Sequence, residues 1–144
     1  MTALERGAGH DYFDVEADVG IHAWGASLAE AFAEATLGLF GLIVDLAEVE
    51  PSETREVRAQ GASSEDLLVN WLNECLYVHE IEGFVVRRVE VDRCGKSLAH
   101  GVLCGEEFDR RRHRPGTIVK AATLHGVSVT ESDGRWDIRV IVDV

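Results

Sequence analysis

Two short acidic segments hold the side chains of this sequence that are best suited to bind a cation. The chain ends on Asp143 and Val144, so a side-chain carboxylate and a terminal carboxylate are expected one residue apart. The other segment runs from Asp14 through Glu16 to Asp18, with three acidic side chains in five residues. Carboxylate oxygens are hard ligands of the kind that calcium and magnesium prefer. Both segments are therefore candidates for a metal site, although acidic turns are also common as plain solvated loops.

Asp18 and the terminal pair form one site only if they lie on neighbouring strands. Residues 136–144 have the pattern of a final strand, and a terminus tied into a sheet is held in place. Carboxylates brought close together repel one another unless a cation neutralises them or one of them binds a proton. The alternative is that the two segments never meet, and the residues alone leave both arrangements open.

Basic residues offer a second kind of chemistry. Lys120 lies inside an apolar stretch, where a buried ammonium needs a partner such as a carboxylate, although an outward-facing lysine is the commoner arrangement. Residues 110–114 hold four arginines and His113. This basic run could contact phosphate, but the three acidic residues at positions 106, 107 and 109 favour charge balance on a solvated face. The six histidines show no ligand spacing, and we expect most of them at the surface or in turns.

Several familiar catalytic motifs are absent from the sequence. It has no G-x-S-x-G elbow, no H-E-x-x-H zinc helix, no Cys/His nucleophile motif and no G-x-x-x-x-G-K-[ST] phosphate loop. Three cysteines without a C-x-x-C pair argue against a disulfide framework or a zinc cluster. An independent enzyme built on two or three carboxylates alone would have a sparse active site.

The elements that must position these residues follow from the apolar pattern. Period-two alternation predicts strands over residues 11–15, 19–24, 55–60, 84–91, 97–104 and 136–144, with further extended segments at 119–124 and 126–130. Capping signals at Ser27 and Ser63 predict two helices, the first ending before Pro51 and the second near Glu82. The order β-β-α-β-α-β-β-β-β predicts an α+β fold. We expect a two-layer sandwich in which both helices cover one face of a mostly antiparallel sheet.

Length and charge limit the class of protein further. A chain of 144 residues predicts one domain, here residues 11–144 after a flexible lead-in at 1–10. The formal net charge of −12 disfavours direct nucleic-acid binding, which depends on neutralising phosphates with Lys and Arg. No apolar run approaches the length of about 18 residues that a membrane span needs, and we expect no export signal because residues 1–10 lack an apolar core. The expected compartment is the cytoplasm.

Several of these segments together resemble the archease family, from about residue 11 to the end of the chain. The stretches that carry the resemblance are residues 17–25 (Ala-Asp-Val-Gly-Ile-His-Ala-Trp-Gly), 28–35, 68–77, 105–113, 119–126 and 142–144. The resemblance implies a small α+β protein that is not itself an enzyme. It implies a protein cofactor of an RtcB-type RNA ligase, which promotes guanylylation of the ligase and its multiple turnover in tRNA splicing or RNA repair. RNA would be met indirectly, through the ligase, and no membrane is involved.

The family's metal site transfers to this sequence residue by residue. The resemblance implies that Asp18, Asp143 and Val144 hold a divalent cation, with calcium expected and magnesium or manganese as alternatives. It also implies that Lys120 acts on the partner or on its phosphate. One departure stands beside the site, because Val15 and Glu16 occupy the positions where the family usually has His and Thr. The competing hypotheses are an independent metal-dependent phosphoesterase and a chaperone-like scaffold with a structural calcium site.

Overall fold

The computed structural model describes residues 7–144, which form seven strands, two α-helices and one short 3-10 helix. The predicted element order is confirmed, with the two extended segments at 119–130 joined into one strand. The elements are β1 (Gly9–Val15), β2 (Asp18–Gly25), α2 (Leu28–Ile43), η1 (Leu46–Glu48), β3 (Glu53–Gln60), α3 (Ser64–Glu82), β4 (Phe84–Cys94), β5 (Leu98–Glu107), β6 (Ala121–Ser132) and β7 (Arg135–Asp143).

The strands form two sheets in which every named strand pair is antiparallel. One sheet has the order β1-β2-β7-β6 and the other the order β3-β5-β4. β1 begins at Gly9, two residues before the predicted boundary, because Gly9 and His10 pair with Trp24 and Ala23 of β2. The rest of the predicted lead-in includes residues 1–6, which lie outside the described part of the chain.

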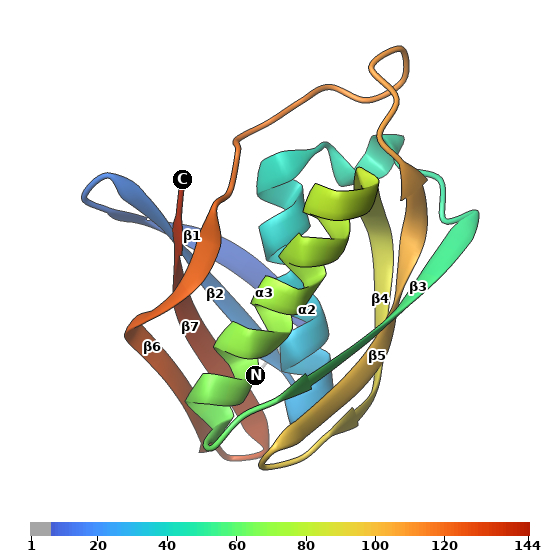
Figure 1. Cartoon of the computed structure of the whole chain (residues 1–144). Coiled ribbons are helices and arrows are strands. Elements are labelled where there is room, and N and C mark those ends of the chain that lie inside the picture. The colour runs from blue at the N-terminus through green and yellow to red at the C-terminus, as the bar shows by residue number, and fades with distance from the viewer. Residues whose placement is uncertain (1–6) are drawn as a thin grey trace.

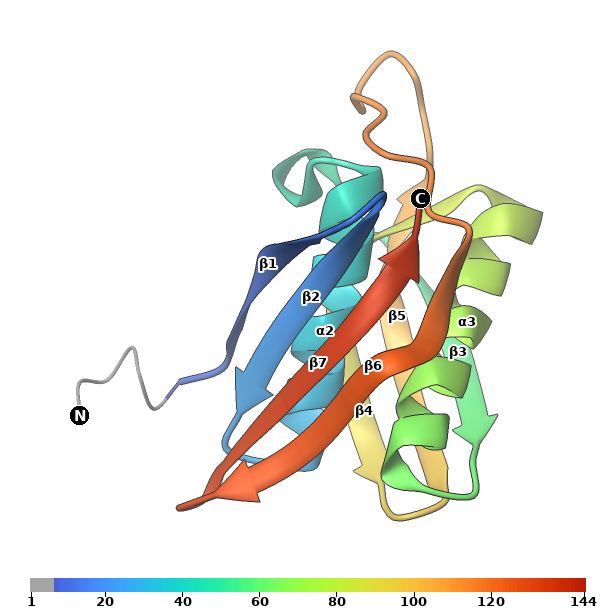
Figure 2. The same ribbon diagram turned by 90° about the vertical axis from the view of Figure 1, so that its left-hand side faces the viewer.

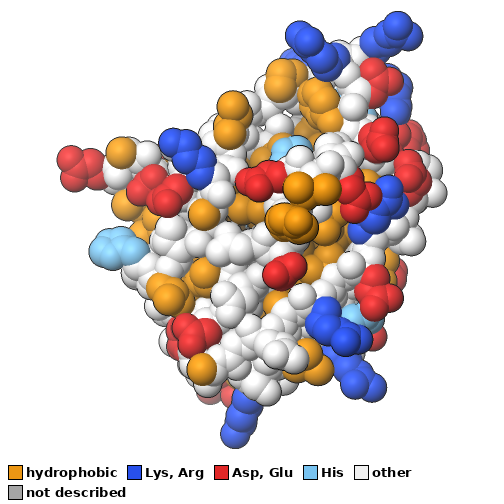
Figure 3. Space-filling view, viewed as in Figure 1, with side chains coloured by type: hydrophobic (Ala, Val, Ile, Leu, Met, Phe, Trp, Pro, Cys, Tyr) orange, Lys and Arg blue, Asp and Glu red, His pale blue; other side chains and the backbone are white. Residues whose placement is uncertain are grey.

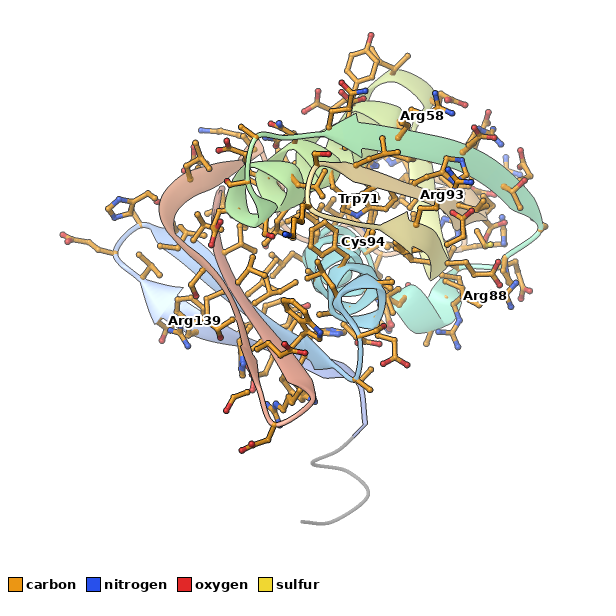
Figure 4. All side chains as sticks on the ribbon, turned by 90° about the horizontal axis from the view of Figure 1, so that it is seen from below. Arg58, Trp71, Arg88, Arg93, Cys94 and Arg139 are labelled. Carbon is orange, nitrogen blue, oxygen red and sulfur yellow. The ribbon has the colours of Figure 1, made fainter. Side chains whose placement is uncertain are left out.

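The helices lie between the two sheets (Figures 1 and 2). The α+β class is therefore confirmed, whereas the predicted single sheet with both helices on one face is divided into two sheets, with the helices packed between them and one face of α3 exposed. The reason is visible in α2, which contacts β1, β2 and β7 on one side and β4 on the other. A helix that is apolar on most of its circumference must be covered on more than one side. Arg139 lies on the outer side of one sheet and Arg58, Arg88 and Arg93 on the outer side of the other (Figure 4).

Both helices start where their capping signals predict. Ser27 Oγ accepts a hydrogen bond from the backbone N–H of Glu30, and Ser63 Oγ accepts one from Asp66. α3 ends at Glu82 and is capped by Gly83, whose φ of 65° is the left-handed conformation that glycine adopts without steric cost. α2 ends at Ile43, earlier than the approach to Pro51, and a 3-10 turn fills the interval.

A buried hydrogen-bond chain joins the two helices in the core. The indole Nε1 of Trp71 donates to Thr36 Oγ1 over 2.9 Å, and Thr36 Oγ1 donates to the Phe32 carbonyl over 2.7 Å. Figure 4 shows Trp71 pointing into the interior. Cys75, Cys94 and Cys104 are all free, as the sequence predicts. In residues 7–144, no helix combines the length and the apolar character that crossing a bilayer requires.

Candidate cation site and its supporting loop

The structure brings Asp18 and Asp143 together at one end of the four-stranded sheet. Val19 pairs with Val142 across β2 and β7, so the next position along each strand places Asp18 opposite Asp143. Residues directly opposite one another in an antiparallel pair have Cβ atoms roughly 4.5–5.5 Å apart. Side chains alternate between the two faces of a strand, and Ile21 and Ala23 of β2 face the core. Asp18 therefore belongs to the outer face, and so does Asp143.

These two carboxylates have no cationic partner within residues 7–144. Neither side chain makes a hydrogen bond or an ion pair with a described residue. A basic group further along the same outer face, Arg139, has its guanidinium carbon 4.0 Å above the ring of Phe13. Two half-buried carboxylates that face one another without compensation fit a hard divalent cation, since oxygen is the ligand that such ions take. No cluster of three or more His, Cys, Asp or Glu side chains suited to a metal occurs in residues 7–144, so further ligands would be main-chain or terminal oxygens, as from Val144.

Lys120 reaches the same end of the sheet by its backbone. Its N–H donates to the carbonyl of Asp143 over 2.8 Å, immediately before β6 begins at Ala121. The side chain is exposed and makes no ion pair with either carboxylate. The outward-facing alternative is therefore correct for Lys120 in this structure, and its ammonium is available to a ligand or a partner.

The hairpin before Asp18 contains a strained residue. Ala17 has a φ of 66°, the left-handed region that costs an L-residue roughly 1–2 kcal/mol. Val15 pairs with Asp18, so Glu16 and Ala17 form the tip of the hairpin, and both are exposed. Glu16, one of the two residues that depart from the family pattern, makes no hydrogen bond or ion pair with another described residue.

A buried ionic cluster supports the loop that leads to Lys120. Glu106 is 7% exposed and His113 is 2% exposed, and His113 Nε2 lies 2.9 Å from Glu106 Oε2. His113 Nδ1 accepts a hydrogen bond from the backbone N–H of Asp109, so Nε2 carries the proton and donates to the carboxylate. His113 is an exception to the expectation that most histidines lie at the surface or in turns, because this loop folds over it.

Glu106 collects four hydrogen bonds from three residues. Arg112 donates to both carboxylate oxygens over 2.6 and 3.1 Å, and the backbone N–H of Glu50 donates over 2.8 Å. The Arg112 guanidinium, helped by Glu50 and His113, lowers the pKa of Glu106 to about 2 against the opposing effect of desolvation. The carboxylate is therefore ionised at neutral pH, where it fixes the loop.

Backbone hydrogen bonds also hold the segment between the Glu106–His113 pair and Lys120. Gly116 N–H donates to the Ile43 carbonyl over 2.8 Å and Thr117 N–H to the Leu42 carbonyl over 2.6 Å. Together with the bond from Lys120 to Asp143, they tie residues 116–120 to the end of α2 and to β7. The position of Lys120 thus depends on contacts made several residues earlier.

Some of the arginines in the basic run at residues 110–114 are paired with nearby carboxylates. Arg112 pairs with Glu106 and Asp109, and Arg114 lies 3.8 Å from Glu48. The side chains of Arg110 and Arg111 make no ion pair with a described residue. The prediction of a mixed, solvated charge run is therefore correct for most of the segment. The buried Glu106–His113 pair was not predicted, since no periodic pattern marks either residue as buried and the charge run itself is the single signal.

Comparison with known proteins places the chain in a family. Residues 10–144 match the family model described as the archease protein family (MTH1598/TM1083). The protein archease of Pyrococcus abyssi is 37% identical over 138 residues, covering 93% of this chain and 97% of that protein. The protein archease of Danio rerio is 36% identical over 139 residues, covering 94% of this chain and 85% of that protein. The solution structure of Methanobacterium thermoautotrophicum protein 1598 is 34% identical, covers 94% of this chain and 99% of that one, and superposes with a TM-score of 0.77.

Fold and comparisons together define an α+β protein with two antiparallel sheets of the archease type. The chain belongs to the archease family.

Proposed function

We propose that this protein is a non-catalytic activator of an RtcB-type RNA ligase, acting in the cytoplasm in tRNA splicing or RNA repair. Its action would be to promote guanylylation of the ligase and to sustain multiple turnover. RNA would be contacted through the ligase, in keeping with a net charge of −12.

The observation that carries the proposal is the uncompensated pair of Asp18 and Asp143 at the end of the sheet. The two carboxylates and an oxygen of Val144 would form a hard donor set, and the exposed Lys120 lies at the same end of the sheet. Guanylyl transfer moves negative charge among phosphate oxygens, and catalysis of such a step consists mainly of positioning and electrostatic stabilisation. A bound divalent cation, calcium by expectation, would supply positive charge for this purpose.

The residues of this chain would divide that task. Asp18 and Asp143 would fix the cation site relative to the sheet, because both side chains start from paired strands. Lys120 would offer a second positive charge, and its main chain is held in place by the hydrogen bond from its backbone N–H to the Asp143 carbonyl. Activation without catalysis suits this set, since two carboxylates and one lysine would make a sparse active site for an independent enzyme.

The experiment compares ligase turnover on a 3′-phosphate RNA with and without this protein. We expect the wild type to raise the number of RNA ends joined per ligase, and Asp18→Asn and Asp143→Asn each to remove most of the gain. Asp133→Asn is the matched control, because Asp133 is an exposed acidic residue in the β6–β7 turn and its left-handed φ of 53° is one that Asn tolerates. Absence of stimulation by the wild type would exclude the function. Phosphate release by the protein alone would favour a phosphoesterase.

A further inference from the structure

A hydrophobic surface borders the candidate site on the side of α3. Ile118 is 81% exposed, Ile81 66% and Tyr77 60%, the three highest values among the large hydrophobic side chains of residues 7–144. Tyr77 and Ile81 are four residues apart, so they lie on one face of the helix. Figure 3 shows hydrophobic side chains gathered over the C-terminal half of α3 and the segment that leads to β6. Large apolar side chains that gather exposed on one face of a protein commonly mark a binding site.

A hollow of about 380 Å³ lies between α3 and the segment 115–119. Ile43, at the end of α2, and Phe108 line it together with Ile118 and Val119. His79, Glu80 and Gly83 contribute the remaining wall from the α3 side, with Pro115, Gly116 and Thr117 opposite. The hollow is thus apolar in most of its lining and wide enough for a large side chain.

This surface is continuous with the end of the sheet that carries Asp143. The amide of Asn73 forms two hydrogen bonds with the backbone of Ala122, and α3 and β6 run in opposite directions (Figure 2). Four helical residues rise about 6 Å, nearly the length of two extended residues. Tyr77, one turn beyond Asn73, therefore lies toward Lys120, and Ile118 lines the same hollow as Glu80, the neighbour of Ile81. A partner that approaches Lys120 would meet the hydrophobic surface as well.

The rim of the surface is acidic. Glu74 and Glu80 are exposed on α3 beside Tyr77 and Ile81, and neither forms an ion pair with a described residue. An uncompensated acidic rim attracts a basic partner and repels a second copy of the same acidic chain. A protein that holds RNA must present basic surface, and the charge therefore favours the ligase over self-association.

We propose that the surface formed by Tyr77, Ile81 and Ile118 docks the protein partner. The partner segment would insert an apolar side chain into the hollow and place Lys or Arg against Glu74 and Glu80. This inference rests on the proposed function and adds to it the place and chemistry of the contact. A few buried apolar anchors commonly dominate the affinity of such interfaces.

The test measures the concentration of this protein that gives half-maximal stimulation of the ligase. The doubly substituted Ile81→Ser/Ile118→Ser variant is expected to raise that concentration by about tenfold or more and to leave the maximal stimulation unchanged. Leu124→Ser is the matched control, because Leu124 is 55% exposed on β6 and does not line the hollow. Glu80→Lys should also raise the half-maximal concentration, with a smaller effect at high salt. Since all these side chains are exposed, thermal unfolding of the variants should match the wild type.

The outcomes distinguish failure of the docking surface from failure of the activator function. Stimulation that saturates within twofold of the wild-type concentration in the Ile81→Ser/Ile118→Ser variant would overturn the docking surface and leave the activator function intact. Loss of a wild-type homodimer in the same variant, with unchanged ligase saturation, would also overturn it, because the occupant would then be a second copy. A wild type that does not stimulate the ligase overturns the activator function and, with it, the docking proposal.

Discussion

Ala17 is a non-glycine residue in the left-handed region, one position before Asp18. Replacement by glycine removes a steric cost of roughly 1–2 kcal/mol, and the added freedom of the unfolded chain takes back about 0.4–1 kcal/mol. We expect Ala17→Gly to raise the free energy of unfolding by roughly 0.5–1 kcal/mol in urea titrations, on the balance of these two effects. Ala17→Val should lower it, because a β-branched residue fits this conformation worse than alanine. A glycine variant less stable than the wild type would show that the hairpin stores no strain.

Glu106 gives the loop 108–120 a defined pH dependence. Its pKa is lowered to about 2, chiefly by Arg112, so the folded state binds the proton more weakly than the unfolded state does. The stabilisation is complete above the unfolded pKa of about 4.3 and is lost as the pH falls toward 2. Glu106→Gln should lower the free energy of unfolding at pH 7 by roughly 2–3 kcal/mol, because charged hydrogen bonds are weakened.

The control for this prediction is the difference in the free energy of unfolding between wild type and Glu106→Gln at low pH. The stability of wild type and Glu106→Gln should converge between pH 4.5 and pH 2, as measured by urea unfolding at several pH values. If the free energies of unfolding of the two proteins change with pH in parallel through this window, the pKa of Glu106 is the same in the folded and unfolded states. In the glutamine variant, weaker stimulation of the ligase would further indicate that the loop positions Lys120.

Among the elements, β6 depends on α3 for the protection of its free edge. β6 is the last strand of its sheet, and Asn73 offers Ala122 one donor at 3.2 Å and one acceptor at 2.8 Å in place of another strand. Asn73→Ala leaves an edge N–H and carbonyl without these partners. We expect a loss of roughly 1–3 kcal/mol in the free energy of unfolding and faster amide exchange at Ala122. Unchanged exchange at this amide would contradict the pairing.

Local sequence patterns predicted the positions of the helices and strands. Contacts between residues far apart in the sequence could not be predicted from such patterns. Ser27 and Ser63 mark helix starts because capping involves residues three apart. The division into two sheets depends on which strands pair across the molecule, and alternation within a strand carries no such information. Asp18 and Asp143 were predicted as one site through the family resemblance, since 124 intervening residues give no register. Glu106 and His113 were missed as a buried pair, because charged residues in a charge run are usually solvated.

At the scale of the whole molecule, the two uncompensated carboxylates should link stability to cation concentration. A cation present at 100 times its dissociation constant stabilises the folded state by about 2.7 kcal/mol. We expect calcium to raise the unfolding midpoint of the wild type and to leave Asp18→Asn/Asp143→Asn unchanged. In a chelator, the variant should be the more stable protein, because substitution removes the repulsion between the carboxylates. An equal calcium response in both proteins would place the binding elsewhere.

The activator function can be measured as the rate of ligase guanylylation with GTP and divalent cation, followed as covalent GMP on the ligase. We expect a faster rate with wild-type protein and almost none of that acceleration with Asp143→Asn, while Asp133→Asn should behave as wild type. Equal acceleration by wild type and Asp143→Asn, with the fold of both intact by circular dichroism, would contradict this expectation.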